Sequence, residues 1–208
     1  LGDGNDTLIG GDGNDILFGG GGDDVITGGS GLDVAIFQNN IQDYSITNTA
    51  GSLQLMGPLN DGNDILTGVE RLQFSNVTLA FDLDGNAGNA AKLLGAVLGS
   101  DSVANTEFVG IALSFLDSGM GFEELMQLAL DTLLGPAPTN ETIITFFYTN
   151  LIGEEPSAGL LAEFLPLLDT GAFTPSSLGL AAAEHDINLT NIDLIGLTQT
   201  GIEYLPSV

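Results

Sequence analysis

Four consecutive units of nine residues, LGDGNDTLI (1–9), GGDGNDILF (10–18), GGGGDDVIT (19–27) and GGSGLDVAI (28–36), decide the fold of the first part of the chain. Their shared form is Gly-Gly-x-Gly-x-Asp-x-apolar-x. The sixth and eighth places hold Asp6, Asp15, Asp24 and Asp33, and Leu8, Leu17, Ile26 and Ala35, respectively. A flexible glycine linker would not keep an aspartate and an apolar residue in phase through all the units, so the stretch predicts a repeated structure.

The local chemistry of each unit predicts a turn followed by a short strand. Glycines at places one, two and four allow positive φ, where a β-carbon would clash. The last three residues, such as Thr7-Leu8-Ile9, favour a strand whose eighth-place side chain is buried. Two units then make one coil of eighteen residues, in which Leu8 stacks on Ile26 and Leu17 on Ala35. The predicted fold is a parallel β-roll with a core one side chain wide.

Such a core is too thin to hold the coil by itself. Each ordered residue costs about 1–2 kcal/mol of backbone entropy, and a buried Leu returns only about 1.5–3 kcal/mol. No Lys or Arg within residues 1–36 balances the aspartates, which therefore repel one another. A cation with a flexible shell of carboxylate and carbonyl oxygens removes both difficulties, and Ca²⁺ suits such a shell better than Mg²⁺.

The calcium ligands are expected from turns that lie above one another, which belong to alternate units. This pairs Asp6 with Asp24 and Asp15 with Asp33 and predicts at least two sites. The units resemble the calcium-binding nonapeptide repeats of the RTX (repeats-in-toxin, haemolysin-type) family of secreted bacterial proteins. The resemblance implies that places three and five contribute mainly backbone oxygen. The further candidate ligands in the turns are Gly2, Asp3, Gly4, Gly11, Asp12, Gly13, Gly20, Gly22, Asp23, Gly29 and Gly31.

Composition excludes several classes of function. The chain has 28 acidic and 2 basic residues and a net charge of −26, which excludes nucleic acid and anionic lipid surfaces as electrostatic partners. A hydrophobic content of 43% is too high for a disordered acidic tail. The chain has no cysteine and one histidine, which leaves zinc without its usual ligands. No apolar run is long enough to predict a membrane span.

After Ile36 the pattern predicts strands that cap the roll, at 43–46 and 53–55. Residues 60–68 keep half of the motif through Gly62, Asp64 and Leu66, which leaves two alternatives open: an Asn-Gly turn into a strand or a third calcium site. The segment around Val69-Glu70-Arg71-Leu72 resembles the stretch that ends many RTX β-rolls. Arg71 is expected to pair with a carboxylate. We assign residues 1–82 to this domain.

Residues 83–208 have the 3.6-residue period of helices and predict an all-α helical bundle domain. The first helix is expected near Ala87, with Asp84 or Asn86 as its cap, and a later one at Thr174-Pro175. Asp82 to Asn86 lacks the spacing of an EF-hand. Residues 79–88, 147–159 and 188–205 resemble a helical domain of unknown function found beside RTX repeats and in S-layer proteins, although its usual first-helix Arg is missing here.

No catalytic constellation is found, and Glu184-His185-Asp186 is expected at the surface rather than in an active site. The sequence therefore predicts a non-enzymatic calcium-binding module of a larger, secreted extracellular protein. Resemblance to RTX proteins implies the type I secretion machinery as a partner, with a secretion signal toward the C-terminus and any catalytic domain upstream. The alternative is an S-layer or adhesion module that binds itself or a cell-surface glycan.

Overall fold

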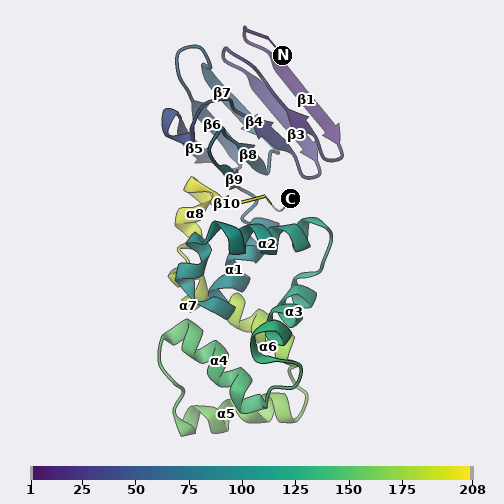
Figure 1. Cartoon of the computed structure of the whole chain (residues 1–208), viewed down its shortest axis with the longest axis vertical. Helices are drawn as coiled ribbons and strands as arrows, with labels where there is room; N and C mark the ends of the chain where they lie inside the picture. The colour runs from purple at the N-terminus through teal and green to yellow at the C-terminus, as the bar shows by residue number, and fades with distance from the viewer. Residues whose placement is uncertain (1, 207–208) are drawn as a thin grey trace. The chain divides into compact units, whose positions relative to one another are not determined.

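The computed structural model describes residues 2–206, which form two compact units. The first unit comprises the residues up to Leu83 together with Gly196–Pro206, and the second comprises Asp84–Ile195. Strands fill the first unit and helices the second (Figure 1). The predicted order, a strand-rich N-terminal region followed by helices, is confirmed. The C-terminal segment that joins the first unit was not expected from the sequence.

One sheet of the first unit has the strand order β1-β3-β7-β6-β5. Its strands are β1 (Thr7–Asp12), β3 (Val25–Ser30), β5 (Ser45–Thr49), β6 (Ser52–Met56) and β7 (Asn63–Thr67). The strands β1, β3 and β7 are parallel, and β7, β6 and β5 are antiparallel. The predicted strands at 43–46 and 53–55 correspond to β5 and β6. In the sheet, β6 and β5 lie next to the parallel strands, on the side of β7. The sheet is therefore mixed rather than purely parallel.

The other sheet has the order β10-β9-β8-β4-β2 and is also mixed. Its strands are β2 (Ile16–Leu17), β4 (Val34–Ile36), β8 (Arg71–Gln73), β9 (Thr78–Ala80) and β10 (Ile202–Tyr204). Here β2, β4 and β8 are parallel, whereas β9 and β10 are antiparallel additions. The strand β10 pairs with β9 across more than a hundred residues of sequence, and no local pattern marks it.

Register in both sheets follows the predicted coil of eighteen residues. Leu8 lies beside Ile26, and Leu17 lies beside Ala35. Each column then continues into the segment after the repeats, because Leu66 lies beside Ile26 and Leu72 beside Ala35. Residues 60–68 therefore form a turn into a strand, one of the two predicted alternatives, and this strand is the next one of the parallel stack.

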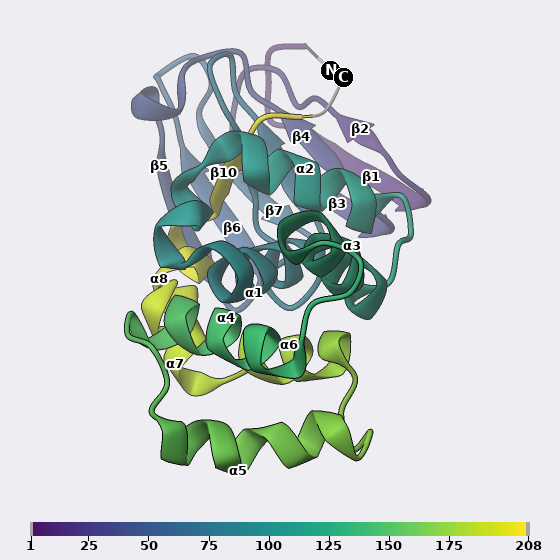
Figure 2. The same cartoon turned by 60° about the horizontal axis from the view of Figure 1, so that its bottom comes forward.

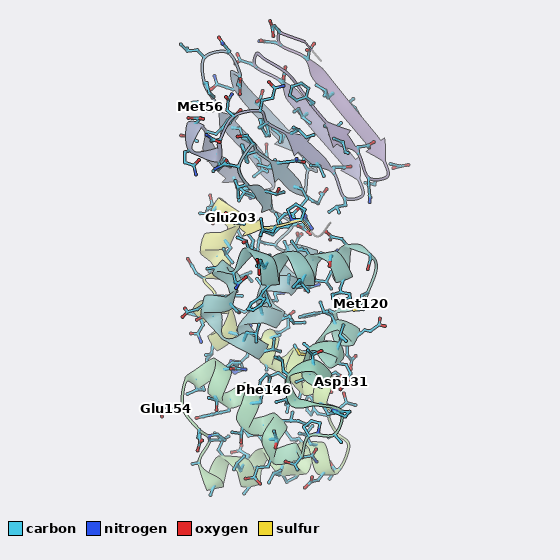
Figure 3. All side chains as sticks on the ribbon, viewed as in Figure 1. Met56, Met120, Asp131, Phe146, Glu154 and Glu203 are labelled. Atoms are coloured by element: carbon cyan, nitrogen blue, oxygen red, sulfur yellow. The ribbon has the colours of Figure 1, made fainter. Side chains whose placement is uncertain are left out.

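The core of the first unit is wider than the single column predicted from the repeats. Leu66 and Leu72 are fully buried, and Leu53 and Leu55 of β6 add a second set of inward side chains. Phe37 and Phe74 stack with ring centroids 5.3 Å apart and contact Tyr44. Met56, labelled in Figure 3, points outward from β6 and is 63% exposed. The segments after residue 36 thus contribute much of the apolar burial that stabilises the coils.

The second unit contains α1 (Asn86–Leu98), α2 (Thr106–Asp117), α3 (Phe122–Leu134), α4 (Asn140–Ile152), α5 (Ala158–Asp169), α6 (Pro175–Ala183) and α7 (Asp186–Asn191), and α8 (Leu194–Thr200) begins in it. The central helix α1 packs against α2, α4 and α6 (Figure 2). Gly95 permits the close approach of α7 to α1, since a Cβ there would lie 2.4 Å from Asn188 Oδ1. Within residues 2–206, no helix has the length and apolar character needed to cross a membrane.

Helix starts in the second unit test the predicted caps. Thr174 and Ser177 form a reciprocal capping box ahead of α6, with Pro175 in its first turn, as predicted. The expected cap of α1 is wrong: Gly85 occupies the N-cap without a side-chain hydrogen bond. Asn86 instead donates from Nδ2 to Asp117 Oδ1 at 2.8 Å, so its side chain joins α1 to the end of α2.

Candidate metal centre

The structure brings the sixth-place aspartates together in the pairs predicted from the sequence. The backbone N–H of Asp6 donates to Asp24 Oδ1 at 2.8 Å, and the N–H of Asp15 donates to Asp33 Oδ1 at 2.8 Å. Asp24 is 2% exposed and Asp33 is fully buried. Each pair joins residues eighteen apart, because two units complete one coil. Carboxylates from successive coils therefore lie one above the other.

Both series of carboxylates continue past the last repeat. The N–H of Asp24 donates to Asp64 Oδ1 at 2.9 Å, and the N–H of Asp33 donates to Glu70 Oε2 at 2.9 Å. We call Asp6, Asp24 and Asp64 the first carboxylate stack, and Asp15, Asp33 and Glu70 the second. The half motif at 60–68 pointed to Asp64. Glu70 was not among the predicted ligands, because its place beside Asp33 follows from the strand register that puts Leu72 beside Ala35.

Side chains at the fifth place connect the same turns through the backbone. Asn5 Oδ1 accepts from the N–H of Asp23 at 3.0 Å, and Asn14 Oδ1 accepts from the N–H of Leu32 at 3.0 Å. Asp23 Oδ1 accepts in turn from the N–H of Asn63 at 2.8 Å. These side chains satisfy backbone donors of the neighbouring turns. The place-three residues Asp3 and Asp12 are exposed.

Glycine is required in these turns for two different reasons. At places two and four the backbone has φ between 110° and 135°, which a residue with a β-carbon rarely adopts. These residues are Gly4, Gly11, Gly13, Gly20, Gly22, Gly29 and Gly31. The place-one glycines Gly10, Gly19 and Gly28 do not have a positive φ, contrary to the prediction. Place one needs glycine for space: a Cβ on Gly10 would lie 2.5 Å from Asp15 Oδ2 and 2.6 Å from Gly28 O.

The second oxygen of the place-six carboxylates identifies where a cation fits. Asp15 Oδ2 and Asp33 Oδ2 are buried and have no hydrogen-bond partner. A buried carboxylate oxygen without a donor or counter-ion is costly. The described residues contain no group of three or more His, Cys, Asp or Glu side chains placed to hold an ion. The carboxylates thus occur in pairs, and backbone carbonyls must complete the oxygen shell that Ca²⁺ prefers.

The first stack borders a small polar cavity of about 20 Å³. Gly19, Gly20, Asp24, Asp61 and Asp64 are among the residues that line it. This volume exceeds the roughly 10–15 Å³ that one water molecule needs, so the cavity has room for one small ion. Asp61 Oδ2 accepts from Asn39 Nδ2 at 2.7 Å and from the Tyr44 hydroxyl, which holds it at the edge of the site.

Burial acts strongly on the carboxylates at the end of each stack. It raises the pKa of Asp64 from 3.8 to about 6, and the nearby charge of Asp24 acts in the same direction. Burial also raises the pKa of Glu70, with a further contribution from the charge of Asp33. Both groups resist ionisation in the absence of a cation because they are partly buried and, in addition, because their neighbours are other carboxylates. A bound divalent ion would reverse this effect by supplying the missing positive charge.

Arg71 pairs with a carboxylate that belongs to neither stack. Its guanidinium forms an ion pair with Asp82, as the expected pairing with a carboxylate requires, and lies 5.9 Å from the centre of the Tyr204 ring. Arg71 is 1% exposed. The buried pair joins β8 to the segment after β9 and supports the strand that holds Glu70 in position.

Of the comparisons with known proteins, the match to one family model agrees with this geometry. Among curated proteins, no significant match to the chain is found. The extracellular lipase LipA from Serratia marcescens is 28% identical over a match that covers 35% of this chain and 13% of the lipase chain, with a TM-score of 0.25. Residues 2–35 match the family model of the RTX calcium-binding nonapeptide repeat in four copies. The turns that stack the buried aspartates are therefore RTX repeats, and calcium is the ion that they bind.

Proposed function

We propose that the chain is a calcium-dependent folding module of a larger extracellular bacterial protein, in which it supports type I secretion and stability. The observation that carries this proposal is the pair of buried oxygens, Asp15 Oδ2 and Asp33 Oδ2, that have no hydrogen-bond donor. The folded coils leave these charges uncompensated until calcium binds. The role is one of binding, and any catalytic activity belongs to another part of the longer protein.

Linkage gives the mechanism of folding. Calcium that binds only the folded coils stabilises them by RT ln(1 + [Ca]/Kd), or about 2.7 kcal/mol per ion at a hundred times Kd. Extracellular calcium modules have Kd values of about 10⁻⁴ to 10⁻³ M. At the low calcium concentration of a cytoplasm, the repeats would stay open and able to pass a secretion channel. Outside the cell they would close into a β-roll formed by the parallel strands of both sheets.

Resemblance to RTX proteins supports the secretion step, in which an uncleaved signal toward the C-terminus of the protein leads the unfolded chain. The charge of the chain is compatible with this order of events. With 28 acidic and 2 basic residues, the unfolded chain repels itself and resists collapse before it meets calcium.

Hydrogen exchange measured by mass spectrometry tests the folding step, with the whole chain in excess EDTA and in millimolar calcium. We expect the amides of residues 7–36 to be protected only in calcium, because local protection follows local stability. The helices α1 to α6 serve as an internal control and should change little. Equal protection of residues 7–36 in both conditions would contradict the proposal.

A second candidate function, calcium-dependent assembly at a cell surface, is favoured by a cavity in the helical unit. It has a volume of about 250 Å³, and its lining includes Phe147, Leu151, Leu160 and Phe164. These residues leave an apolar opening between α4 and α5 that suits an apolar contact. Sedimentation in millimolar calcium separates the functions, since an assembly module forms oligomers and a folding module stays monomeric.

A further inference from the structure

We infer that a calcium ion binds beyond the last repeat, between Asp33 and Glu70, and that Glu70 replaces the aspartate of a nonapeptide at this site. This inference rests on the proposed calcium-binding function and extends it to a residue outside the repeats. Four observations support it. They are the hydrogen bond from the Asp33 N–H to Glu70, the strand register, the buried Asp33 oxygen without a donor, and the Gly68 carbonyl oxygen beside Gly28.

Glu70 makes the same contact as a sixth-place aspartate. Its Oε2 accepts from the N–H of Asp33 at 2.9 Å, as Asp33 Oδ1 accepts from the N–H of Asp15 at 2.8 Å. Strand register agrees, since β8 is parallel to β4 with Arg71 beside Val34, which places Glu70 beside Asp33. Glu70 is thus the third member of the second carboxylate stack.

The oxygen environment around Gly28 repeats the one around Gly10. A Cβ on Gly10 would lie 2.5 Å from Asp15 Oδ2 and 2.6 Å from Gly28 O. A Cβ on Gly28 would lie 2.5 Å from Asp33 Oδ2 and 1.8 Å from Gly68 O. In each place a buried carboxylate oxygen and a carbonyl of the next coil converge on the first glycine of the turn. The group of oxygens around Gly28 includes the carbonyl of Gly68, a residue that lies outside the repeats.

The free oxygen of Asp33 needs a positive partner at this place. Asp33 is fully buried, and its Oδ2 has no hydrogen-bond donor. The nearest basic side chain in sequence, Arg71, is paired with Asp82. A cation held by Asp33, Glu70 and the Gly68 carbonyl compensates the buried charge with hard oxygen ligands, which is the chemistry of calcium. The turn from Gly68 to Glu70 is shorter than a nonapeptide turn, and the longer side chain of Glu reaches the ion from it.

The variant Glu70→Gln tests the site in the whole chain. Gln keeps an oxygen that accepts from the Asp33 N–H but removes the negative charge, and Glu107→Gln on α2 is the matched control at an exposed position. Calcium stoichiometry is measured by isothermal titration calorimetry after removal of calcium with EDTA. We expect Glu70→Gln to bind one ion fewer per chain than the unmodified protein and Glu107→Gln to bind the same number.

Equal stoichiometry and affinity in Glu70→Gln would overturn the inference while leaving the calcium-binding module intact. Failure of the unmodified chain to bind any calcium would overturn both. Anomalous diffraction from crystals of the unmodified chain grown with calcium gives an answer that does not depend on the folding of a variant. An ion within about 2.3–2.6 Å of oxygens of Asp33 and Glu70 supports the site, whereas ions at the repeats alone refute it.

Discussion

Asp33 Oδ1 accepts a hydrogen bond from the backbone N–H of Asp15 at 2.8 Å, while its other carboxylate oxygen is buried without a donor. One side chain thus holds two successive coils together through one oxygen and offers the other to an ion. The Asp33 carboxylate therefore has both a structural role and a metal-binding role. Because its buried charge needs a cation, the packing of the coils depends on calcium.

The variant Asp33→Asn separates these two roles. Asn keeps the acceptor for the Asp15 N–H and removes the charge, so we expect weaker calcium binding. At calcium concentrations near a hundred times Kd, the loss of one ion lowers the free energy of unfolding by about 2.7 kcal/mol. Calorimetric titration and chemical unfolding in calcium measure both effects. Asp12→Asn, at an exposed third place, is the control, and an equal loss in both variants would argue against a special role for the sixth place.

Gly28 tests the close approach of successive turns. Its φ is not in the left-handed region, yet a Cβ there would meet the Gly68 carbonyl oxygen at 1.8 Å. We expect Gly28→Ala to cost about 3 kcal/mol of stability in calcium, at the upper end of overpacking effects. Gly121→Ala is the control, because Gly121 has a φ of −68° and a Cβ there has no atom within 4 Å. Urea unfolding of both variants measures the difference, and similar midpoints would contradict the observed packing.

Leu66 tests the column of side chains that continues past the repeats. It is fully buried beside Ile26, whereas its neighbour Ile65 points to the other face of β7 and is 42% exposed. We expect Leu66→Ala to lower the free energy of unfolding by about 2–5 kcal/mol and Ile65→Ala to have a much smaller effect. Chemical unfolding in calcium checks this. If both variants cost the same, β7 does not have the register seen here.

The raised pKa of Asp64 predicts how pH affects the calcium-free first unit. Because this pKa is about 6 in the folded chain against 3.8 normally, the folded state binds a proton more tightly than the unfolded state. In EDTA, the contribution of Asp64 therefore favours the folded state at acidic pH and is lost as pH rises through about 6, so the calcium-free unit, open near neutral pH, should gain structure as the pH falls. Circular dichroism in EDTA from pH 4 to pH 7 measures it. Asp64→Asn should flatten this dependence, and a variant that keeps the full slope would assign the effect to other groups.

The buried Arg71 forms an ion pair with Asp82, which is 14% exposed, and removing one partner leaves the other charge without its counter-ion. Removing one partner of such a pair costs about 3–5 kcal/mol. We expect Arg71→Met to destabilise the first unit by that amount. The double variant Arg71→Met with Asp82→Asn should recover part of the loss, since no buried carboxylate then lacks its partner. The unfolding free energies of Arg71→Met, Asp82→Asn and the double variant give a double-mutant cycle. If the losses of the two single variants simply add up in the double variant, the two side chains are not coupled.

The repeats determined their own local structure. Glycine spacing and the eighteen-residue coil predicted that Leu8 lies beside Ile26 and Leu17 beside Ala35, and the strand register has both pairs. These features depend on turns and side chains that recur within one or two units, so a periodic sequence contains the information for them. The helix start at Thr174-Pro175 is predictable for the same reason, because a cap depends on residues within one turn.

Tertiary structure alone decided how the stacks of carboxylates end. Glu70 lies beside Asp33 because Leu72 is buried beside Ala35, and the pairing of β10 with β9 brings residues 202–204 into the same sheet. Neither contact has a local signal, since each depends on burying apolar surface between segments far apart in the sequence. The sequence by itself determined the calcium-binding aspartates of residues 1–36. Only the packing of the segments after residue 36 decided that Asp64 and Glu70 continue the two carboxylate stacks.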